Sequence, residues 1–522
     1  MTARRLRMLV APAVAVLGLA AFGPSAFGQC SSDPSIICYD LGTLGETHST
    51  AQLINESGQV LAKAQSSTDR VRAFVWTEAD GAWDLGNLGG ESTWGLDMNE
   101  SGQVVGNSYT KSAGESHAFL WTEEGGMVDL GTLGGLTSSA EHVNEAGQVA
   151  GYSETDLGYA NAFFWTGEGG MVDLGTLGGN YSRATDMNES GQVVGFSPPD
   201  PLGYTHAFLW TEEGEMVDLG TLGRTSSARH INESGQVAGA SITDAWETHA
   251  FVWTEEGGMV DLGTLGGTST SIWDMNESGQ VVGSSYAESV NVYHAFLWTE
   301  GEPMVDLGTL GGLWSTAYFI NESGQVVGYG PTSMGEHHPF FWTEEGGMVS
   351  LGTLGGSYSV PTDLNEAGEV VGYGPTDMGE THAFFWSQEG GMVDLGTLGG
   401  NFSRAVDIND AGQIVGYSTI ETGESHATVW VVFPATPDEQ IEALIDDIEE
   451  LVTSGDLLGG LGRALIAKLE AVDTENPKQA ENVLENAFKP QVERLVSRGV
   501  LTPEEGQALI DAADAIIEGL TT

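Results

Sequence analysis

A repeat of 43 to 45 residues runs nine times through the chain and limits the possible folds more than any other feature. Each copy carries the phrase D-L-G-T-L-G or a close variant. The first leucine of the phrase stands at Leu41, Leu85, Leu130, Leu174, Leu219, Leu262, Leu307, Leu351 and Leu395. A fixed period of this length is typical of propellers, solenoids and other repeat arrays. We therefore expect one structural unit copied nine times.

The unit that begins at Met127 contains four short apolar runs joined by two constant turns and two variable connections. One constant turn is N-E-S-G-Q or a variant. It begins at Asn55, Asn99, Asn144, Asn188, Asn232, Asn276, Asn321, Asn365 and Asn409. Asn and Gly at a tight reversal between apolar runs predict a β-hairpin. Each unit is thus predicted to be a four-stranded antiparallel sheet.

The third predicted strand is apolar on both faces. Its side chains alternate, with Phe119 and Trp121 on one face and Ala118 and Leu120 on the other. A strand buried on both faces belongs to a sheet packed between neighbouring sheets, as in a propeller blade. A single 44-residue unit cannot bury both faces, so each unit needs its neighbours.

The two ends of the repeat region complement each other. Residues Ile36 to Leu41 form a fourth strand with no preceding partners, and the last copy ends at its third strand, His426 to Trp430. We therefore predict an all-β, closed β-propeller of about nine four-stranded antiparallel blades. Because propellers usually have four to eight blades, an open solenoid or a distorted ring is the alternative.

These residues resemble the extracellular repeat family called HAF after its His-Ala-Phe tripeptide. The tripeptide stands at His117, His206, His249, His294 and His382, and variants begin at Arg72, Asn161, His338 and His426. The resemblance covers about residues 36–430 and implies an exported protein. It implies no established activity. We interpret the histidines as structural hydrogen-bonding groups, because Arg72 and Asn161 at the same position are not normal zinc ligands.

The chain divides into three parts. Residues 1–28 resemble a signal peptide, with Arg4, Arg5 and Arg7 before an apolar run and a small-residue site before Gln29. Residues 29–434 are the predicted propeller and residues 435–522 a helical domain. We expect a secreted, extracellular protein with no membrane span in the mature chain, a periplasmic or cell-surface location being the alternative. Cys30 and Cys38 are expected to form a local disulfide in an oxidising compartment.

The C-terminal part is predicted to be a small all-α bundle. Thr436-Pro437-Asp438-Glu439 and Thr502-Pro503-Glu504-Glu505 are helix-start signals. Apolar faces follow them, at Ile441, Leu444, Ile445, Ile448 and Leu451 and at Leu509, Ala512, Ile516 and Leu520. The sequence from Leu501 resembles the FIMAH module of exported bacterial proteins. A kink is expected at Pro490.

The net charge of −57 argues against a nucleic-acid partner, because phosphate contacts need clustered Lys and Arg. No cofactor is expected, and the acidic composition makes a bound calcium ion the alternative. Five repeats place an Asp before the constant turn in a way that imitates the start of a calcium loop: Asp97, Asp186, Asp274, Asp363 and Asp407. No bidentate Glu follows at the twelfth position, so a hairpin turn explains the pattern better.

No G-x-S-x-G, H-E-x-x-H or phosphate-loop motif occurs, so we expect no enzymatic activity. Recognition usually resides in variable loops on a rigid scaffold. The connections between one repeat and the next carry candidate ligand-binding aromatics: Trp94, Tyr181, Trp314, Tyr358 and Phe402. The predicted function is binding of an extracellular polysaccharide or protein through this face, and packing of the aromatics within the loops is the alternative for these residues. A structural or cell-surface adhesion protein and a propeller-based hydrolase or lyase are the alternative functions.

Overall fold

The computed structural model describes residues 27–28, 30, 36–201, 203–288 and 290–432, and parts of 441–517. The predicted signal peptide, residues 1–28, lies outside the described residues except for its last two. Contacts divide the chain into two compact units, residues 1–431 and 432–522. The first unit is built of β-strands, and the helices lie in the second.

The first unit is a β-propeller made of repeated antiparallel sheets. The first strands of the repeats are β3 (His48–Ile54), β7 (Gly89–Met98), β11 (Gly134–Val143), β15 (Arg183–Met187), β19 (Gly223–Ile231), β23 (Gly266–Met275), β27 (Thr316–Ile320), β31 (Val360–Leu364) and β35 (Gly399–Ile408). The second strands are β4 (Val60–Gln65), β8 (Val104–Thr110), β12 (Val149–Thr155), β16 (Val193–Ser197), β20 (Val237–Thr243), β24 (Val281–Ala287), β28 (Val326–Pro331), β32 (Val370–Pro375) and β36 (Gln413–Ile420).

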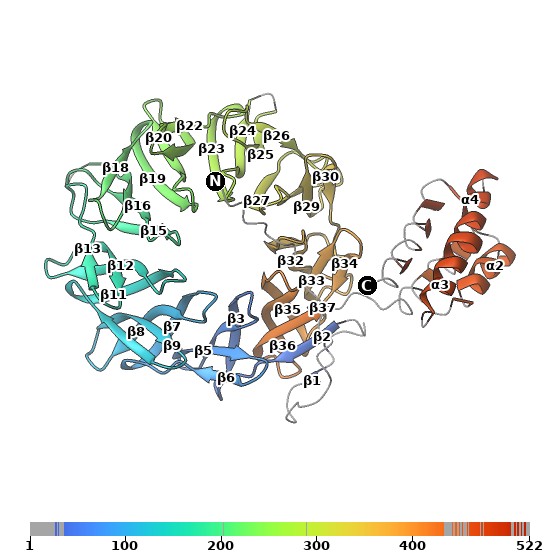
Figure 1. Cartoon of the computed structure of the whole chain (residues 1–522), viewed down its shortest axis with the longest axis horizontal. Helices are drawn as coiled ribbons and strands as arrows, with labels where there is room; N and C mark the ends of the chain where they lie inside the picture. Colours follow the sequence, from blue (N-terminus) through green and yellow to red (C-terminus); the bar gives the residue numbers. More distant parts are fainter. Residues whose placement is uncertain are drawn as a thin grey trace, which may run out of the picture. The chain divides into compact units, whose positions relative to one another are not determined.

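The third strands are β5 (Val71–Thr77), β9 (Ser116–Thr122), β13 (Ala160–Thr166), β17 (His206–Trp210), β21 (Thr248–Thr254), β25 (Val292–Trp298), β29 (His337–Thr343), β33 (Thr381–Ser387) and β37 (Ser425–Val432). The fourth strands are β6 (Gly81–Asp84), β10 (Gly126–Gly131), β14 (Gly170–Asp173), β18 (Val217–Gly220), β22 (Gly258–Asp261), β26 (Val305–Gly308), β30 (Gly347–Ser350) and β34 (Gly391–Asp394). We number the repeats 1 to 9 from β3. In Figure 1 the sheets follow one another in chain order, with the first strands toward the common centre.

Repeat 9 takes its outer strand from the start of the region. Strand β2 (Ile36–Asp40) lies beside β37, and the short β1 (Phe27–Gly28) pairs with β2. The N–H of Leu41 donates to the carbonyl of Ala427 at 2.9 Å. Cys30 and Cys38, at the start of this region, form a disulfide.

The third strands form the core between the sheets, as their two apolar faces predict. In β9, Phe119 and Trp121 belong to a cluster with Leu61 and Val75 of repeat 1. Ala118 and Leu120, on the opposite face, belong to a cluster with Ala140 and Phe163 of repeat 3. Burial of each large apolar side chain contributes roughly 1.5–3 kcal/mol, so contacts between sheets are the main source of stability.

The constant turns link neighbouring repeats by hydrogen bonds. In repeat 6, the Asn276 carboxamide oxygen accepts from the Gln280 N–H, and its nitrogen donates to the Asn321 carbonyl of repeat 7 at 3.1 Å. The same bond joins the last repeat to the first, where Asn409 Nδ2 donates to the Asn55 carbonyl at 3.0 Å. A buried amide that bridges two turns explains why Asn recurs at this position.

One glycine of the second strand is required by the close approach of the first strand. A Cβ on Gly106 would lie 1.9 Å from the Trp94 carbonyl oxygen. The register of β7 and β8 shifts between Gly95 and Asp97, which marks a β-bulge. At Gly106 the first strand therefore lies too close for a side chain to fit.

Two candidate aromatics do not lie in loops. Trp94 belongs to β7 and Phe402 to β35, whereas Tyr181, Trp314 and Tyr358 precede the first strands of their repeats. The expected loop position of Trp94 and Phe402 is therefore wrong. The chain pairs with the end of the second strand as early as Gly89 and Gly399, and this pairing between backbones is invisible in the hydrophobic pattern.

The second unit contains α2 (Gly459–Leu469), α3 (Pro477–Val483), a π-helical turn η1 (Leu484–Phe488) and α4 (Lys489–Ser497). Its core includes the predicted apolar residues Ile441, Leu444, Ile448, Leu509 and Ile516. The helix-start signals, apart from Thr502, lie outside the described residues, as do Ala512 and Leu520.

The interruption expected at Pro490 takes the form of the π-helical turn. The N–H of Lys489 donates to the Leu484 carbonyl, five residues earlier. The wider turn gives room to the proline ring, which would clash with a carbonyl in a regular α-helix.

Candidate functional site

Most of the predicted aromatics pack on a ring of the second strand in their own repeat. Ring centroids are 5.4 Å apart for Trp94 and Tyr109, 6.4 Å for Tyr181 and Phe196, 5.8 Å for Trp314 and Tyr329, and 5.7 Å for Phe402 and Tyr417. His337 lies next to two of the candidates. Its ring contacts the Trp314 ring, and its backbone forms an isolated β-bridge with the backbone of Tyr358. The others lie on separate repeats.

Trp94 lines an open cavity of about 570 Å³ between repeats 2 and 3. Its lining residues are Trp94, Leu96, Asn107, Tyr109, Gly114, Ser116, Thr137, Ser138, Ser139 and Tyr152. Gly114 belongs to the connection between a second and a third strand, and Thr137 lies near the start of a first strand. The cavity therefore lies on the side of the sheets that carries the variable connections.

The aromatic wall comes from repeat 2. The rings of Trp94 and Tyr109 meet edge to face at 84°, a favourable arrangement of two aromatic side chains. Tyr152 of repeat 3 lines the cavity from the other sheet and carries the Arg183 guanidinium over its ring at 5.1 Å. Contacts with neighbouring side chains thus hold the Trp94, Tyr109 and Tyr152 rings in place at the cavity.

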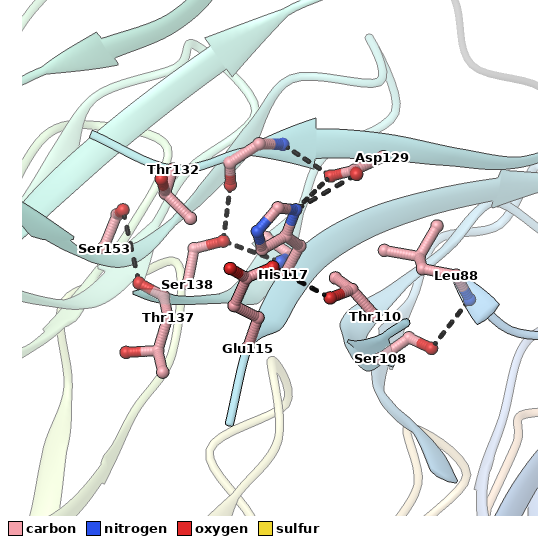
Figure 2. Close-up of polar contacts among 12 residues, drawn as sticks. Leu88, Ser108, Thr110, Glu115, His117, Asp129, Thr132, Thr137, Ser138 and Ser153 are labelled. Carbon is pink, nitrogen blue, oxygen red and sulfur yellow. Dashed lines mark hydrogen bonds and ion pairs between the residues drawn. The ribbon is translucent and has the colours of Figure 1, made fainter. Parts of the chain in front are cut away.

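The floor of the cavity is held by polar contacts between the two repeats. Figure 2 shows Ser138, whose hydroxyl accepts from the Ala118 N–H at 2.7 Å and donates to the Gly131 carbonyl at 2.6 Å. Thr137 pairs with Ser116, and Asn107 donates to the Ser116 hydroxyl at 3.0 Å. These bonds fix the backbone of repeat 3 against repeat 2.

Several polar groups of the cavity have no hydrogen-bond partner among the described residues. The lining residues with such groups are Trp94, Tyr109, Tyr152, Thr137 and Ser139, for which the structure records no side-chain hydrogen bond to another described residue. None of the lining side chains carries a charge, although the chain has 74 acidic residues. The cavity therefore offers aromatic surface and neutral hydrogen-bonding groups.

Sequence reasoning found Trp94 and missed the rest of the cavity. A signal was present at Asn107, because five other repeats have an aromatic residue at its position: Tyr152, Phe196, Tyr329, Tyr373 and Tyr417. A small residue there leaves room beside Trp94. The contribution of Thr137 and Ser139 comes from the neighbouring repeat, and no local pattern reveals it.

The histidines of the tripeptide have hydrogen-bonding roles, as predicted. His117 Nδ1 lies 2.9 Å from Asp129 of the fourth strand, as Figure 2 shows, and His382 Nδ1 lies 2.8 Å from Asp394. Asn161 bonds to Asp173 at 3.0 Å, and Arg72 pairs with Asp84. The described residues include no group of three His, Cys, Asp or Glu side chains that could hold a metal ion.

The aspartates before the constant turns bind backbone groups of the next repeat. Asp97 accepts from the Met98 and Val143 N–H groups at 2.9 Å each. Burial raises the pKa of Asp97, and the hydrogen bond from Val143 opposes this effect. Burial also raises the pKa of Asp363 well above its usual value, and the neighbouring Asp407 carboxylate adds to the effect.

A second cavity, of about 350 Å³, lies between repeats 1 and 2. Arg70, Arg72, Glu46, Asp84 and Glu91 are among its lining residues. Arg72 pairs with both Asp84 and Glu46. The Arg72 guanidinium is thus occupied by two carboxylates, and no aromatic side chain is among the described residues that line this cavity, so the Trp94 cavity is the stronger candidate for binding a neutral ligand.

No helix in the described part of the chain is long and apolar enough to cross a membrane. No family model matches the chain, and no curated protein matches it.

Several solved structures are similar to this chain, among them a β-propeller domain. The propeller domain of the Trilobed protease from Pyrococcus furiosus is 10% identical, with a TM-score of 0.36 over 58% of this chain and 98% of that one. A puromycin-hydrolyzing peptidase from Mycobacterium tuberculosis is 13% identical (TM-score 0.37; 76% of this chain and 61% of that one). The BP39L lectin from Burkholderia pseudomallei is 9% identical (TM-score 0.30; 58% and 99%). The activities in these names belong to those proteins.

Proposed function

We propose that this protein is an exported, non-enzymatic β-propeller that binds a neutral glycan in the Trp94 cavity. The observation that carries the proposal is an uncharged cavity with aromatic walls and hydroxyl groups in a chain of net charge −57. Sugar rings present apolar C–H faces to aromatic rings and hydroxyls to neutral donors and acceptors. A cavity of about 570 Å³ is within the usual range for small-ligand sites.

We further infer that the nine repeats close into a ring. Three bonds between the last and first repeats support closure, because they repeat the bonds found between internal neighbours. Asn409 donates to the Asn55 carbonyl, the Ile54 N–H donates to Asp407, and the Ala427 N–H donates to Ser49. Ring closure would hold the cavity walls in place.

Export is proposed from the signal-like residues 1–28 and is consistent with the Cys30–Cys38 disulfide, since disulfides persist in oxidising compartments. A structural or adhesion protein remains the alternative function.

The proposal is tested by titrating the mature protein with a panel of neutral oligosaccharides and measuring binding by calorimetry. Trp94→Ala removes the aromatic wall, and we expect about a 5- to 150-fold loss of affinity, since a buried aromatic contact contributes on the order of 1–3 kcal/mol. Asn107→Tyr fills the cavity with a side chain that other repeats accommodate, so binding should be lost while folding is kept.

Trp83→Ala is the matched control, because Trp83 is an exposed tryptophan on a fourth strand, outside the cavity. Equal binding by all four proteins would contradict the proposal. Shortening of the oligosaccharide during incubation would instead support the hydrolase alternative.

A further inference from the structure

Trp246 occupies a backbone conformation that disfavours its side chain. It lies in the connection between β20 and β21 with a φ of 67°. The same position of the same turn is glycine in four other repeats: Gly158, Gly335, Gly379 and Gly423. The left-handed region strains a bulky aromatic residue, and such strain concentrates at functional positions. A tryptophan here therefore calls for an explanation other than the turn itself.

Packing does not supply that explanation, because 63% of Trp246 is exposed. One face of the indole covers the Arg224 guanidinium, whose carbon lies 4.0 Å from the ring centroid. Arg224 Nη2 also reaches the Asp244 carbonyl at 3.4 Å, and Arg224 Nε is buried with no partner. Arg224 thus holds one face of the ring, and the exposed area remains available to a ligand.

The surroundings of Trp246 favour a sugar over other ligands. Asp244 and Glu247 lie in the same turn as Trp246, and their carboxylates can accept hydrogen bonds from sugar hydroxyls. These two acids outnumber Arg224 and therefore disfavour uronates and sulfated sugars. A cationic ligand is disfavoured because Arg224 already lies against the ring. The single exposed side chain is also far too small for a stable protein interface, which needs roughly 1,000 Å² or more of buried surface.

We infer that Trp246 and Arg224 form a second contact site for neutral glycans, in repeat 5, separate from the Trp94 cavity in repeats 2 and 3. The inference rests on the proposed glycan-binding function. Trp246 lies in the connection between a second and a third strand, and Gly114 of the Trp94 cavity lies in the equivalent connection of repeat 2, so both sites are on the same side of the sheets. A long neutral polymer that engages both sites would bind more tightly than a short oligosaccharide, because the second contact becomes intramolecular.

The test compares the mature full-length protein with Trp246→Gly, Trp94→Ala and the double variant. Calorimetry with short neutral gluco- and manno-oligosaccharides should give two sites for the unchanged protein, one for each single variant and none for the double variant. Trp246→Gly should also raise the melting temperature, because glycine relieves the backbone strain. Loss of a site in a protein that melts later cannot be caused by misfolding.

Met378→Ala is the control, since Met378 is an 82% exposed apolar residue in the equivalent connection of repeat 8. It should keep both sites. If Trp246→Gly keeps both sites, or if Trp94→Ala alone abolishes all binding, the second site is refuted while the Trp94 proposal stands. If the unchanged protein binds none of the oligosaccharides, both proposals are refuted. Equal binding of polygalacturonate would overturn the selection for neutral sugars.

Discussion

Asp363 and Asp407 stand at the same position of neighbouring repeats, and one backbone N–H reaches both carboxylates. The Ile408 nitrogen lies 3.0 Å from Asp363 Oδ2 and 3.0 Å from Asp407 Oδ1. In four repeats the equivalent residue is Leu53, His142, His230 or Phe319, so no other two of these aspartates stand on neighbouring repeats. Burial and the Asp407 charge raise the pKa of Asp363 well above its usual value. The folded protein therefore binds a proton at Asp363 more tightly than the unfolded chain does.

A carboxyl with a raised pKa in the folded state destabilises the fold once it ionises. Stability falls as the pH rises from the unfolded pKa, 3.8, through the folded one. Asp363→Asn removes this penalty, keeps an acceptor for the Ile408 N–H and offers a donor to Asp407. We expect the variant to be more stable than the unchanged protein at pH 7, with the gain vanishing below the unfolded pKa of 3.8. Thermal melts of the variant and the unchanged protein across this pH range provide the measurement. A lower melting temperature of the variant at pH 7 would contradict the prediction.

Ser359 shows how one departure from the repeat removes a hydrogen bond. In repeat 7, the Ser315 hydroxyl accepts from the Ala295 N–H and donates to the Gly308 carbonyl. Ser359 occupies the equivalent position, but its partner strand has Pro339, which has no N–H. The Ser359 hydroxyl is fully buried and has no partner.

The two serines should respond differently to alanine. Ser315→Ala leaves a buried N–H and a buried carbonyl unsatisfied and should cost about 1–3 kcal/mol. Ser359→Ala removes an unsatisfied hydroxyl and should be neutral or stabilising. Denaturant titrations of both variants would decide. Equal destabilisation of the two would mean that the Ser359 hydroxyl has a partner after all.

The element that carries most of the stability is the third strand, because each of its faces packs on a different neighbour. Trp298 ends β25 and lies in a cluster with Ala238 and Val252 of repeat 5. Alternation within the strand predicts this burial. The strand's sequence does not reveal which neighbouring side chains fill the space around it, because some of them, such as Ala238 and Val252, come from the preceding repeat.

Trp298→Ala should lower the free energy of unfolding by about 3–5 kcal/mol, since it leaves a cavity between two sheets. Urea denaturation followed by tryptophan fluorescence measures the change. Glycan binding in the Trp94 cavity should persist at low temperature, because Trp298 lies in repeats remote from it. Trp83→Ala, on the exposed fourth strand β6, should cost far less.

At the scale of the whole molecule, the bonds between repeats 9 and 1 decide whether the region is a ring or an open array. Asn276 and Asn409 are equivalent. Each is buried, bonds to a glutamine four residues on, and donates to an asparagine carbonyl in the next repeat. In a closed ring the two asparagines contribute equally to the stability of the propeller. In an open solenoid Asn409 has no next repeat.

Asn276→Ala and Asn409→Ala should therefore destabilise a closed propeller by the same amount, roughly 2–4 kcal/mol, because both leave buried backbone groups without partners. The comparison needs only thermal or denaturant melts of the two variants. A clearly smaller cost at Asn409 would show that the first and last repeats separate in solution.

The sequence alone determined the repeat period, the four strands of each copy, the core positions of the third strand and the helical tail. These features depend on local patterns: alternation within a strand, glycine and asparagine at turns, and the helical spacing of apolar residues in the tail. The hydrogen-bonding role of the histidines was also predictable, because a residue copied once per repeat cannot gather at one site.

Only the tertiary structure decided where the cavity lies and what lines it. Trp94 was identified from its chemistry, but it was placed in a loop, whereas pairing with β8 puts it in a strand. Asn107 and Ser139 become neighbours only when two sheets pack, and the shared N–H of Asp363 and Asp407 likewise spans two repeats. The physical reason is the same in each case: these features arise from contacts between copies, and the pattern within a single copy contains no information about its neighbour's surface.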